Sequence, residues 1–266
     1  MKILNLYCGI GGNRKLWGDE HEITAVEYNQ EIADVYKKFY PDDEIIVGDA
    51  TEYLMNHWKE FDFIWASPPC QTHSKMRYLA SKRGSYAPKL PDLSLYSMIL
   101  WLKHFCKDKN WVVENVKPYY EVLIEPTIKL DRHLIWSNFN IEEKNFDKPK
   151  VKHNKVSGRT ERYGISLDGI KMKHRKDQII RNCVNPNMAL HILNCSQENN
   201  KTKPLPKGFK EGKCKCGNSY GYCGIDIGYC VKCLDKLKTK PKFPKHMEHR
   251  CRDKDCKFCK EFSPKN

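Results

Sequence analysis

The stretch "MKILNLYCGIGG" (residues 1–12) decides the fold of this chain. Residues 2–8 form a short apolar run, and glycines 9, 11 and 12 follow it at once. An apolar run of this length, bounded by glycine, is typical of a buried parallel strand. Glycine also lets the backbone turn sharply and come close to a ligand. The stretch therefore predicts a strand that leads into a ligand-binding turn.

Strand-like and helix-like segments alternate from this turn onward. Four further apolar runs are predicted to be strands, at residues 22–28, 44–49, 61–67 and 111–116. Residues 30–40 and 94–107 carry apolar side chains every three or four positions, as amphipathic helices do. This alternation predicts an α/β fold with a parallel, doubly wound sheet. Ligands of such sheets bind at the carboxyl ends of the strands.

Two acidic residues stand at the ends of the next two predicted strands. Glu27 lies about twenty residues after the turn, where an acid in nucleotide-binding folds accepts hydrogen bonds from ribose hydroxyls. Asp49 ends the following strand, and we expect it near an adenine amino group. The turn lacks the full G-x-G-x-x-G spacing, which favours a smaller adenosine ligand over a dinucleotide. A generic turn without a ligand is the alternative.

A second motif, "ASPPCQTHS" (residues 66–74), places a cysteine directly after two prolines. The prolines restrict the backbone, so Cys70 is held in place as a nucleophile requires. The fifth strand ends in "VVENVK" (112–117), and we expect Glu114 to approach the same cavity. A thiolate and an acid that shares a proton with a ring nitrogen form a matched pair. The alternatives are an ordinary buried thiol and a glutamate bonded to nearby amides.

These motifs together resemble the DNA cytosine-5 methyltransferases. The resemblance rests on "NLYCGIGG" for the glycine motif, "SPPCQ" for the nucleophile motif, "ENV" for the proton-donor motif and "RNCVNP" for a late asparagine motif. It covers roughly residues 1–195. It implies a Rossmann-like class I S-adenosylmethionine-dependent methyltransferase domain that methylates C5 of a cytosine swung out of the duplex.

The resemblance also implies the roles of individual residues. Cys70 would add to C6 of the cytosine, and Glu114 would engage N3 and the exocyclic amine. Arg132, within "LDRHLIWSN" (130–138), is the candidate for the family's arginine contact to the flipped base, or else a surface ion-pair partner. The cofactor-binding residues would be Tyr7, Gly9, Ile10, Gly11, Gly12, Glu27, Asp49, Ala50, Pro68 and Asn182.

The charge of the chain favours a nucleic-acid partner. The 266 residues carry a net charge of +14, and residues 201–266 hold 18 Lys or Arg against 7 Asp or Glu. A basic segment of this kind suits a polyanion, and a solvated lysine-rich tail is the alternative. We expect double-stranded DNA as the partner, a monomer, no membrane association, and a cytoplasmic place in a prokaryotic or phage-infected cell.

Cysteines concentrate in the same tail. Eight of the 13 cysteines follow residue 213 in close-set groups, which is typical of metal ligands. Zinc prefers four tetrahedral sulfur or imidazole ligands, and reduced thiols without metal are the alternative. One site would use Cys214, Cys216, Cys230 and Cys233, with Cys223 as a possible replacement. A second would use Cys251, Cys256 and Cys259 with His249 or His246.

The predicted organisation is therefore a catalytic domain over residues 1–198, a linker over 199–213 and a zinc module over 214–266. Residues 143–177 form a basic target-recognition region that is short for the family. Two other functions stay open: an RNA (tRNA) cytosine-5 methyltransferase, and a non-catalytic nucleic-acid-binding zinc protein on a methyltransferase fold. The target sequence, and a role in restriction-modification or in a virus, are not determined by the sequence.

Overall fold

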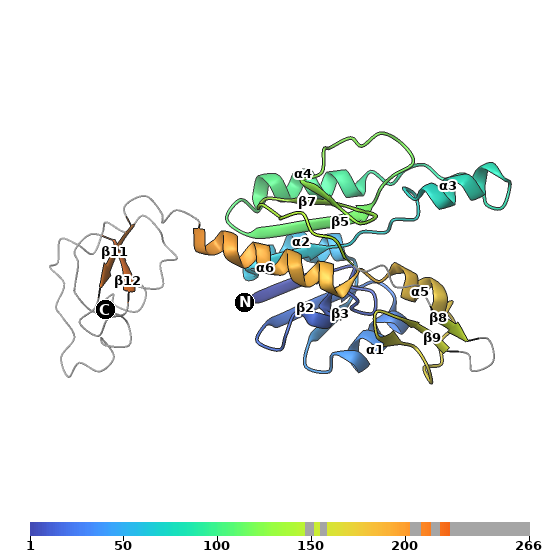
Figure 1. Ribbon diagram of the computed structural model, residues 1–266, viewed down its shortest axis with the longest axis horizontal. Coiled ribbons are helices and arrows are strands. Elements are labelled where there is room, and N and C mark those ends of the chain that lie inside the picture. Colours follow the sequence, from blue (N-terminus) through green and yellow to red (C-terminus); the bar gives the residue numbers. More distant parts are fainter. Residues whose placement is uncertain (147–151, 155–158, 203–208, 214–218, 224–266) are drawn as a thin grey trace. The chain divides into compact units, whose positions relative to one another are not determined.

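The computed structural model (Figure 1) describes the backbone of residues 1–146, 152–154, 159–202, 209–213 and 219–223. The chain divides into two compact units, Met1–Thr202 and Lys203–Asn266. The first unit contains the sheet that the sequence predicts. In the second, β11 (Phe209–Lys213) and β12 (Ser219–Cys223) form an antiparallel pair.

The first unit is built on a seven-stranded sheet in the order β3-β2-β1-β4-β5-β7-β6. The first five strands in this order run parallel, whereas β7 runs antiparallel to both β5 and β6. The sheet confirms the predicted α/β doubly wound fold. The strands are β1 (Lys2–Leu6), β2 (Glu22–Glu27), β3 (Glu44–Val47), β4 (Phe63–Ala66), β5 (Asn110–Val116), β6 (Ile128–Leu130) and β7 (His133–Ser137).

Helices cover both faces of the sheet (Figure 1). On one face, α2 (Ala50–His57) and α4 (Ser94–Phe105) pack against Leu4 and Leu6 of β1. The opposite face carries α6 (Pro186–Thr202), which packs against Ile3 of β1, and α1 (Gln30–Phe39). Side chains alternate between the faces of a strand, so one apolar run supplies both cores. The 3-10 helices are η1 (Arg14–Leu16) and η2 (Trp58–Glu60).

The strand order reverses between β1 and β4, which are hydrogen-bonded neighbours although β2 and β3 lie between them in sequence. Leu6 of β1 is level with Ala66 of β4, and Ala66 is level with Val113 of β5. The turn after β1 and the loop after β4 therefore leave the same edge of the sheet side by side. A reversal of this kind is where open α/β sheets bind ligands.

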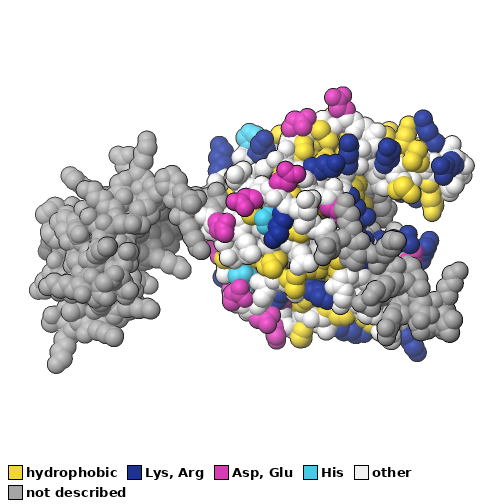
Figure 2. Space-filling model, viewed as in Figure 1, with side chains coloured by type: hydrophobic (Ala, Val, Ile, Leu, Met, Phe, Trp, Pro, Cys, Tyr) yellow, Lys and Arg dark blue, Asp and Glu magenta, His cyan; other side chains and the backbone are white. Residues whose placement is uncertain are grey.

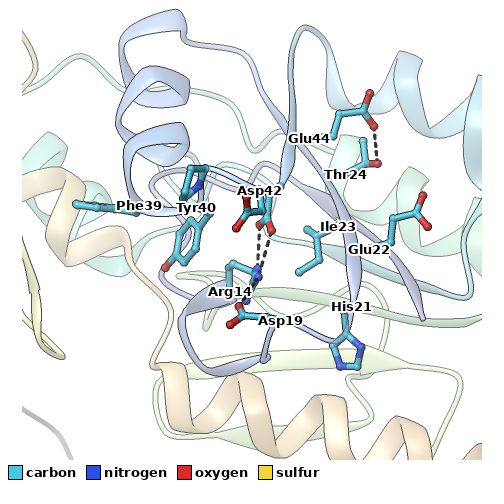
Figure 3. A pocket seen from close by; sticks show the side chains of 12 residues that line it. Arg14, Asp19, His21, Glu22, Ile23, Thr24, Phe39, Tyr40, Asp42 and Glu44 are labelled. Carbon is cyan, nitrogen blue, oxygen red and sulfur yellow. Dashed lines mark hydrogen bonds and ion pairs between the residues drawn. The ribbon is translucent and has the colours of Figure 1, made fainter.

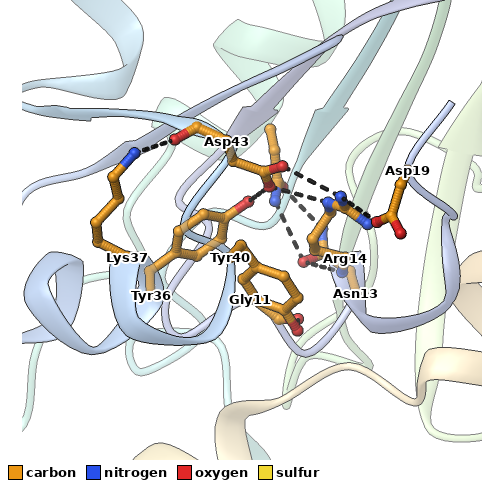
Figure 4. A network of polar contacts seen from close by, with 9 residues as sticks. Gly11, Asn13, Arg14, Asp19, Tyr36, Lys37, Tyr40 and Asp43 are labelled. Atoms are coloured by element: carbon orange, nitrogen blue, oxygen red, sulfur yellow. Dashed lines mark hydrogen bonds and ion pairs between the residues drawn. The ribbon is translucent and has the colours of Figure 1, made fainter. Parts of the chain in front are cut away.

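A buried ion pair lies beside the glycine turn, on the side that faces α1 (Figure 4). Arg14 of η1 donates from Nε and Nη2 to both carboxylate oxygens of Asp43, at 2.9 and 3.1 Å. Tyr36 of α1 also donates to Asp43, and Tyr40 donates to the carbonyl of Gly11 at 2.7 Å. These contacts connect the turn to α1 and to the loop before β3.

A cavity of about 440 Å³ lies next to this network (Figure 3). Glu22 and Glu44, which begin β2 and β3, line it together with Arg14 and Asp19. It therefore opens at the amino ends of the strands. None of the site residues predicted from the sequence lines this cavity, so it is distinct from the site at the carboxyl ends.

Smaller elements follow the sheet. The predicted basic region contains β8 (Lys152–Asn154), β9 (Arg159–Arg162) and β10 (Ile165–Ser166), which form a three-stranded antiparallel sheet, and α5 (Lys176–Asn182) follows it. The segment 199–213, predicted as a linker, includes the end of α6 and strand β11. Within the described ranges, no helix has the length and apolar character needed to cross a bilayer.

Candidate active site

The turn after β1 bends through backbone conformations that suit glycine. Tyr7 and Gly9 have φ angles of 54° and 56°, in the left-handed region. The Gly9 amide donates to Oε2 of Glu27 at 3.0 Å, and the Asn29 amide donates to Oε1 at 2.9 Å. A Cβ atom placed at Gly9 meets nothing within 4 Å. Glu27 therefore holds the turn, and Gly9 leaves its outer side open.

The other two glycines of the turn face the protein. A Cβ at Gly11 would collide with the ring of Tyr40, and one at Gly12 would lie 2.7 Å from Cβ of Cys183. Both glycines are required by packing. The contact at Gly12 also shows that Cys183, within the segment "RNCV", lies against the glycine turn. Asn182 is exposed at the end of α5, beside the buried Cys183, and Ile10 is buried in the core between α1 and α5.

The neighbouring strand ends carry the other predicted cofactor residues. The Tyr7 hydroxyl lies 2.9 Å from the Thr51 hydroxyl, and Ala50 is buried. Asp49 is exposed and caps α2, since its Oδ1 accepts from the amides of Thr51 and Glu52. This cap explains why α2 begins at Ala50. Tyr28, which no sequence motif singled out, directly follows Glu27 and is 79% exposed.

This edge of the sheet fits an adenosine ligand. Gly9 provides open space, and the two oxygens of Glu27 each retain a lone pair for a ribose hydroxyl after accepting one amide. The exposed ring of Tyr28 presents an apolar face to a base. Tyr28 ends the predicted strand 22–28, and no pattern in the sequence indicated that it is exposed.

The Pro-Pro-Cys loop is fixed from both ends. Pro68 is buried, and its carbonyl accepts a hydrogen bond from Nδ2 of Asn115, a buried residue of β5, at 2.9 Å. The Cys70 carbonyl accepts from the amides of His73 and Ser74, at 3.1 and 2.9 Å, in a single helical turn. The Cys70 side chain itself is half-buried. The loop thus presents one thiol from a restrained backbone at the carboxyl end of β4.

Charged groups on two neighbouring elements act on this thiol. Burial raises the pKa of Cys70, and the nearby Glu114 carboxylate raises this pKa further, whereas Arg132 lowers it. Glu114 is itself buried, near the carboxyl end of β5. The structure therefore brings together the three predicted catalytic residues. A negative charge on Glu114 disfavours the Cys70 thiolate, so neutralising that carboxylate favours ionisation of the thiol.

Two basic residues near Glu114 were not predicted. His133, which begins β7, is buried with its Nε2 atom 3.4 Å from Oε1 of Glu114. Arg162 of β9 lies near His133 and donates to the carbonyl of Arg181 at 3.4 Å. Arg132 is exposed and donates to the same carbonyl at 2.8 Å, so its described partner is a backbone oxygen. Sequence patterns gave no signal for these positions, because β7 joins the sheet beside β5 only in the fold.

A cluster of aromatic rings attaches the cysteine loop to the segment after β5. Nδ1 of the buried His73 lies 2.5 Å from the Tyr120 hydroxyl. The rings of Tyr78 and Tyr119 stack with centroids 4.3 Å apart. Ser74 forms an isolated antiparallel bridge with Pro118. The loop that carries Cys70 and the segment that follows Glu114 are therefore held together.

The predicted zinc ligands fall outside the described residues. Across the residues that the structure does describe, no group of three or more His, Cys, Asp or Glu side chains is arranged to hold a metal ion. The ligands in question are Cys214, Cys216, Cys230, Cys233, His249, Cys251, Cys256 and Cys259. The two zinc sites therefore stay predictions.

Residues 1–118 of the chain match the family model of the C-5 cytosine-specific DNA methylases. The match contains the glycine turn, Cys70 and Glu114, and it confirms the resemblance seen in these motifs. The matched region covers less than half of the 266 residues. No curated protein is similar enough to the chain to count as a match.

Three solved structures are similar to part of the chain. A mutant of DNMT2 from Spodoptera frugiperda is 29% identical over 44% of this chain and 35% of that one, with a TM-score of 0.31. A putative DNA modification methyltransferase from an E. coli prophage is 16% identical over 46% of this chain and 33% of its own, with a TM-score of 0.32. The methyltransferase EhMeth from Entamoeba histolytica is 17% identical over 44% and 38%, with a TM-score of 0.29. The matched part of the chain thus spans about a third of each of these proteins.

Proposed function

We propose that the chain transfers a methyl group from S-adenosylmethionine to C5 of cytosine in double-stranded DNA. The match of residues 1–118 to the C-5 cytosine-specific DNA methylase family supports this activity. One observation carries the proposal. The thiol of Cys70 is half-buried on a restrained loop, and the charges of an acid, Glu114, and a cation, Arg132, both act on its pKa. A restrained thiol beside an acid is the arrangement that addition to an electron-poor ring requires.

The cofactor would lie over the glycine turn. Gly9 leaves room for it, Glu27 would accept the ribose hydroxyls, and the exposed ring of Tyr28 would cover the adenine. Asp49 is exposed at the amino end of α2, next to the space that we assign to the adenine. When bound, the cofactor supplies an electrophilic methyl group on a sulfonium sulfur.

The covalent step uses the Cys70–Glu114 pair. The thiolate forms a bond to C6 of the cytosine, and the electrons of the C5–C6 double bond move toward N3, which takes a proton from Glu114. C5, now nucleophilic, would take the methyl group that the cofactor supplies when bound, and the cofactor would leave as a neutral thioether. Water would then take the C5 proton, the bond between C6 and sulfur would break to release the thiolate, and N3 would return its proton to Glu114, which restores the ring and the acid. Because a protonated Glu114 carries no charge, it also permits ionisation of Cys70.

A basic and aromatic arm next to Cys70 supports a nucleic-acid substrate. Residues 71–91 contain five Lys or Arg and no Asp or Glu. The arm includes α3 (Lys75–Lys82), and dark blue and yellow side chains cover it in Figure 2. Arg77 lies over the Tyr86 ring, with its guanidinium carbon 3.9 Å from the ring centroid. Such side chains bind phosphates and stack on bases.

The proposal is tested by methyl transfer from labelled S-adenosylmethionine to duplex DNA and to tRNA. We expect label in duplex DNA at cytosine C5, and no transfer by the Cys70→Ala variant, which still binds the cofactor. A duplex that contains 5-fluorocytosine should trap the chain covalently, because fluorine cannot leave C5 as a proton does. Retained activity in Cys70→Ala contradicts the mechanism, and label confined to tRNA contradicts the substrate.

We also propose that the cysteine-rich tail binds zinc and increases the affinity of the chain for DNA. Its eight cysteines and the charge of residues 201–266 support this role. The metal content of the purified full-length chain tests the first part, with one or two zinc ions per chain expected. Removal of residues 203–266 should weaken DNA binding, and unchanged affinity contradicts the second part.

A further inference from the structure

His133 is held in the sheet so that its ring meets the proposed acid. In the antiparallel pairing of β5 and β7, Glu114 lies opposite Ile135, and His133 is two residues before Ile135 on the same strand. Residues two apart on a strand share a face, so His133 and Glu114 are diagonal neighbours on one side of the sheet. The side chains of both residues are 7% exposed, and Nε2 of His133 lies 3.4 Å from Oε1 of Glu114.

Glu114 is the one polar contact that the structure gives this ring. The Nδ1 atom of His133 is buried and has no hydrogen-bond partner among the described residues. A buried imidazole with one polar contact, to a single carboxylate, is unusual, because ring nitrogens are normally both satisfied. The orientation of the ring is therefore set by the strand and by Glu114.

The charges around His133 favour its neutral form. Burial lowers the pKa of His133, the Glu114 carboxylate opposes this shift, and Arg132 and Arg162 add to it. Asp131, the other charged group that faces the ring, raises this pKa. With the ring neutral at neutral pH, its single N–H is available to one acceptor. A proton on Nε2 gives the ring a donor that points to Oε1 of Glu114.

We infer that His133 is a positioning residue for Glu114. Its Nε2–H donates to Oε1, which fixes the plane of the carboxyl group and leaves Oε2 as the oxygen that exchanges a proton with N3 of the base. His133 neither gains nor loses a proton during turnover. The inference rests on the proposed function, since it gives Glu114 the role of proton donor to cytosine. It adds a residue that none of the sequence motifs includes.

The first test compares two substitutions at His133 in single-turnover methyl transfer to duplex DNA. His133→Phe keeps a ring but removes the donor. We expect the rate to fall about tenfold to hundredfold, because the carboxylate that forms as N3 takes the proton then lacks a hydrogen bond to a charged group. His133→Gln keeps an N–H donor and should stay within about threefold of the wild type. Equal loss in both variants contradicts the inference, because it would follow from packing alone.

The second test separates positioning from a structural role. In a Glu114→Gln background, His133→Phe should cost no further rate, because the group through which His133 acts is already gone. Additive effects of the two substitutions contradict the inference.

The wild type and Cys70→Ala belong in the same assay. If the wild type transfers no methyl group to cytosine, or if Cys70→Ala stays active, the proposed function fails. If both behave as expected while His133→Phe matches the wild type, the function stands and only the role of His133 fails. Cofactor affinity and melting temperature of each variant should stay close to those of the wild type. A large drop in either would mean that the lost methyl-transfer rate results from damage to the fold, which contradicts a role limited to positioning Glu114.

Discussion

Nδ1 of His73 and the hydroxyl of Tyr120 lie 2.5 Å apart, and this hydrogen bond joins the loop of the proposed nucleophile to the segment after the proposed acid. His73 is three residues after Cys70, and Tyr120 is six residues after Glu114. The two halves of the site are therefore held by direct contact as well as by the sheet.

Removal of the Tyr120 hydroxyl should loosen this connection. We expect Tyr120→Phe to lower the methyl-transfer rate about fivefold, since one hydrogen bond to a neutral group contributes about 1 kcal/mol. Cofactor affinity should not change, because the glycine turn is on another strand. Tyr119→Phe is the matched control, as it keeps the ring that stacks on Tyr78. A rate in Tyr120→Phe equal to that of this control would show that the bond does not matter.

The glycines of the first turn should differ in what their substitution damages. Gly9→Ala places a Cβ in open space, at a cost of about 1 kcal/mol for the positive φ, so we expect a folded chain that binds S-adenosylmethionine at least tenfold more weakly. Gly12→Ala puts a Cβ 3.0 Å from the Cα of Cys183, and we expect it to lower the free energy of unfolding by about 3 kcal/mol.

Gly48→Ala is the control for both glycine variants, because its Cβ meets nothing within 4 Å and its φ is not positive. Calorimetry for binding and urea titration for stability separate the effects. A Gly9→Ala protein with wild-type cofactor affinity would contradict the assignment of this turn to the cofactor.

The buried pair of Arg14 and Asp43 should be essential for stability. Asp43→Ala leaves the buried guanidinium with only the exposed Asp19, at 3.6 Å, and we expect a loss of about 3–5 kcal/mol in the free energy of unfolding. The hydroxyl of Tyr36 loses its acceptor as well. The exposed neighbour Asp42 provides the control, because Asp42→Ala should change stability by less than about 0.5 kcal/mol. Similar melting curves for the two variants would count against this account of the pair.

The reactivity of Cys70 should respond to its two charged neighbours in opposite directions. Its pKa is raised, so it is mainly a thiol at neutral pH, and its alkylation should speed up as the pH rises toward and beyond the ordinary thiol value. Glu114→Gln removes a charge that raises this pKa, so alkylation at pH 8 should be faster. Arg132→Gln removes a charge that lowers it, so alkylation should be slower.

Mass spectrometry of the peptide that contains Cys70 follows this reaction separately from the cysteines of the tail. Cys106 serves as an internal reference, because burial raises its pKa to about 12 and it lies outside the site. An alkylation rate that rises in both variants, or falls in both, would mean that these two charges do not set the pKa of Cys70.

Local patterns were enough to predict the sheet and most of its order along the chain. All five strands predicted from residues 2–116, and both helices, are present with ends shifted by a few residues. The apolar runs and the glycine turn specify these elements directly. The helix α2 was not predicted, although Asp49 caps it, because the same aspartate was assigned to the adenine. The small strands β6 and β7 lie in a segment without a clear alternation.

The motifs by themselves indicated the residues that we propose to carry chemistry: a cysteine held behind two prolines, an acid at the next strand end and a glycine turn. Tertiary structure alone decided what surrounds them. His133 and Glu114 meet because β7 pairs with β5 in one register, and His73 reaches Tyr120 because Ser74 and Pro118 form an antiparallel bridge. Contacts of this kind depend on the pairing and packing of distant segments, which no local spacing of residues encodes.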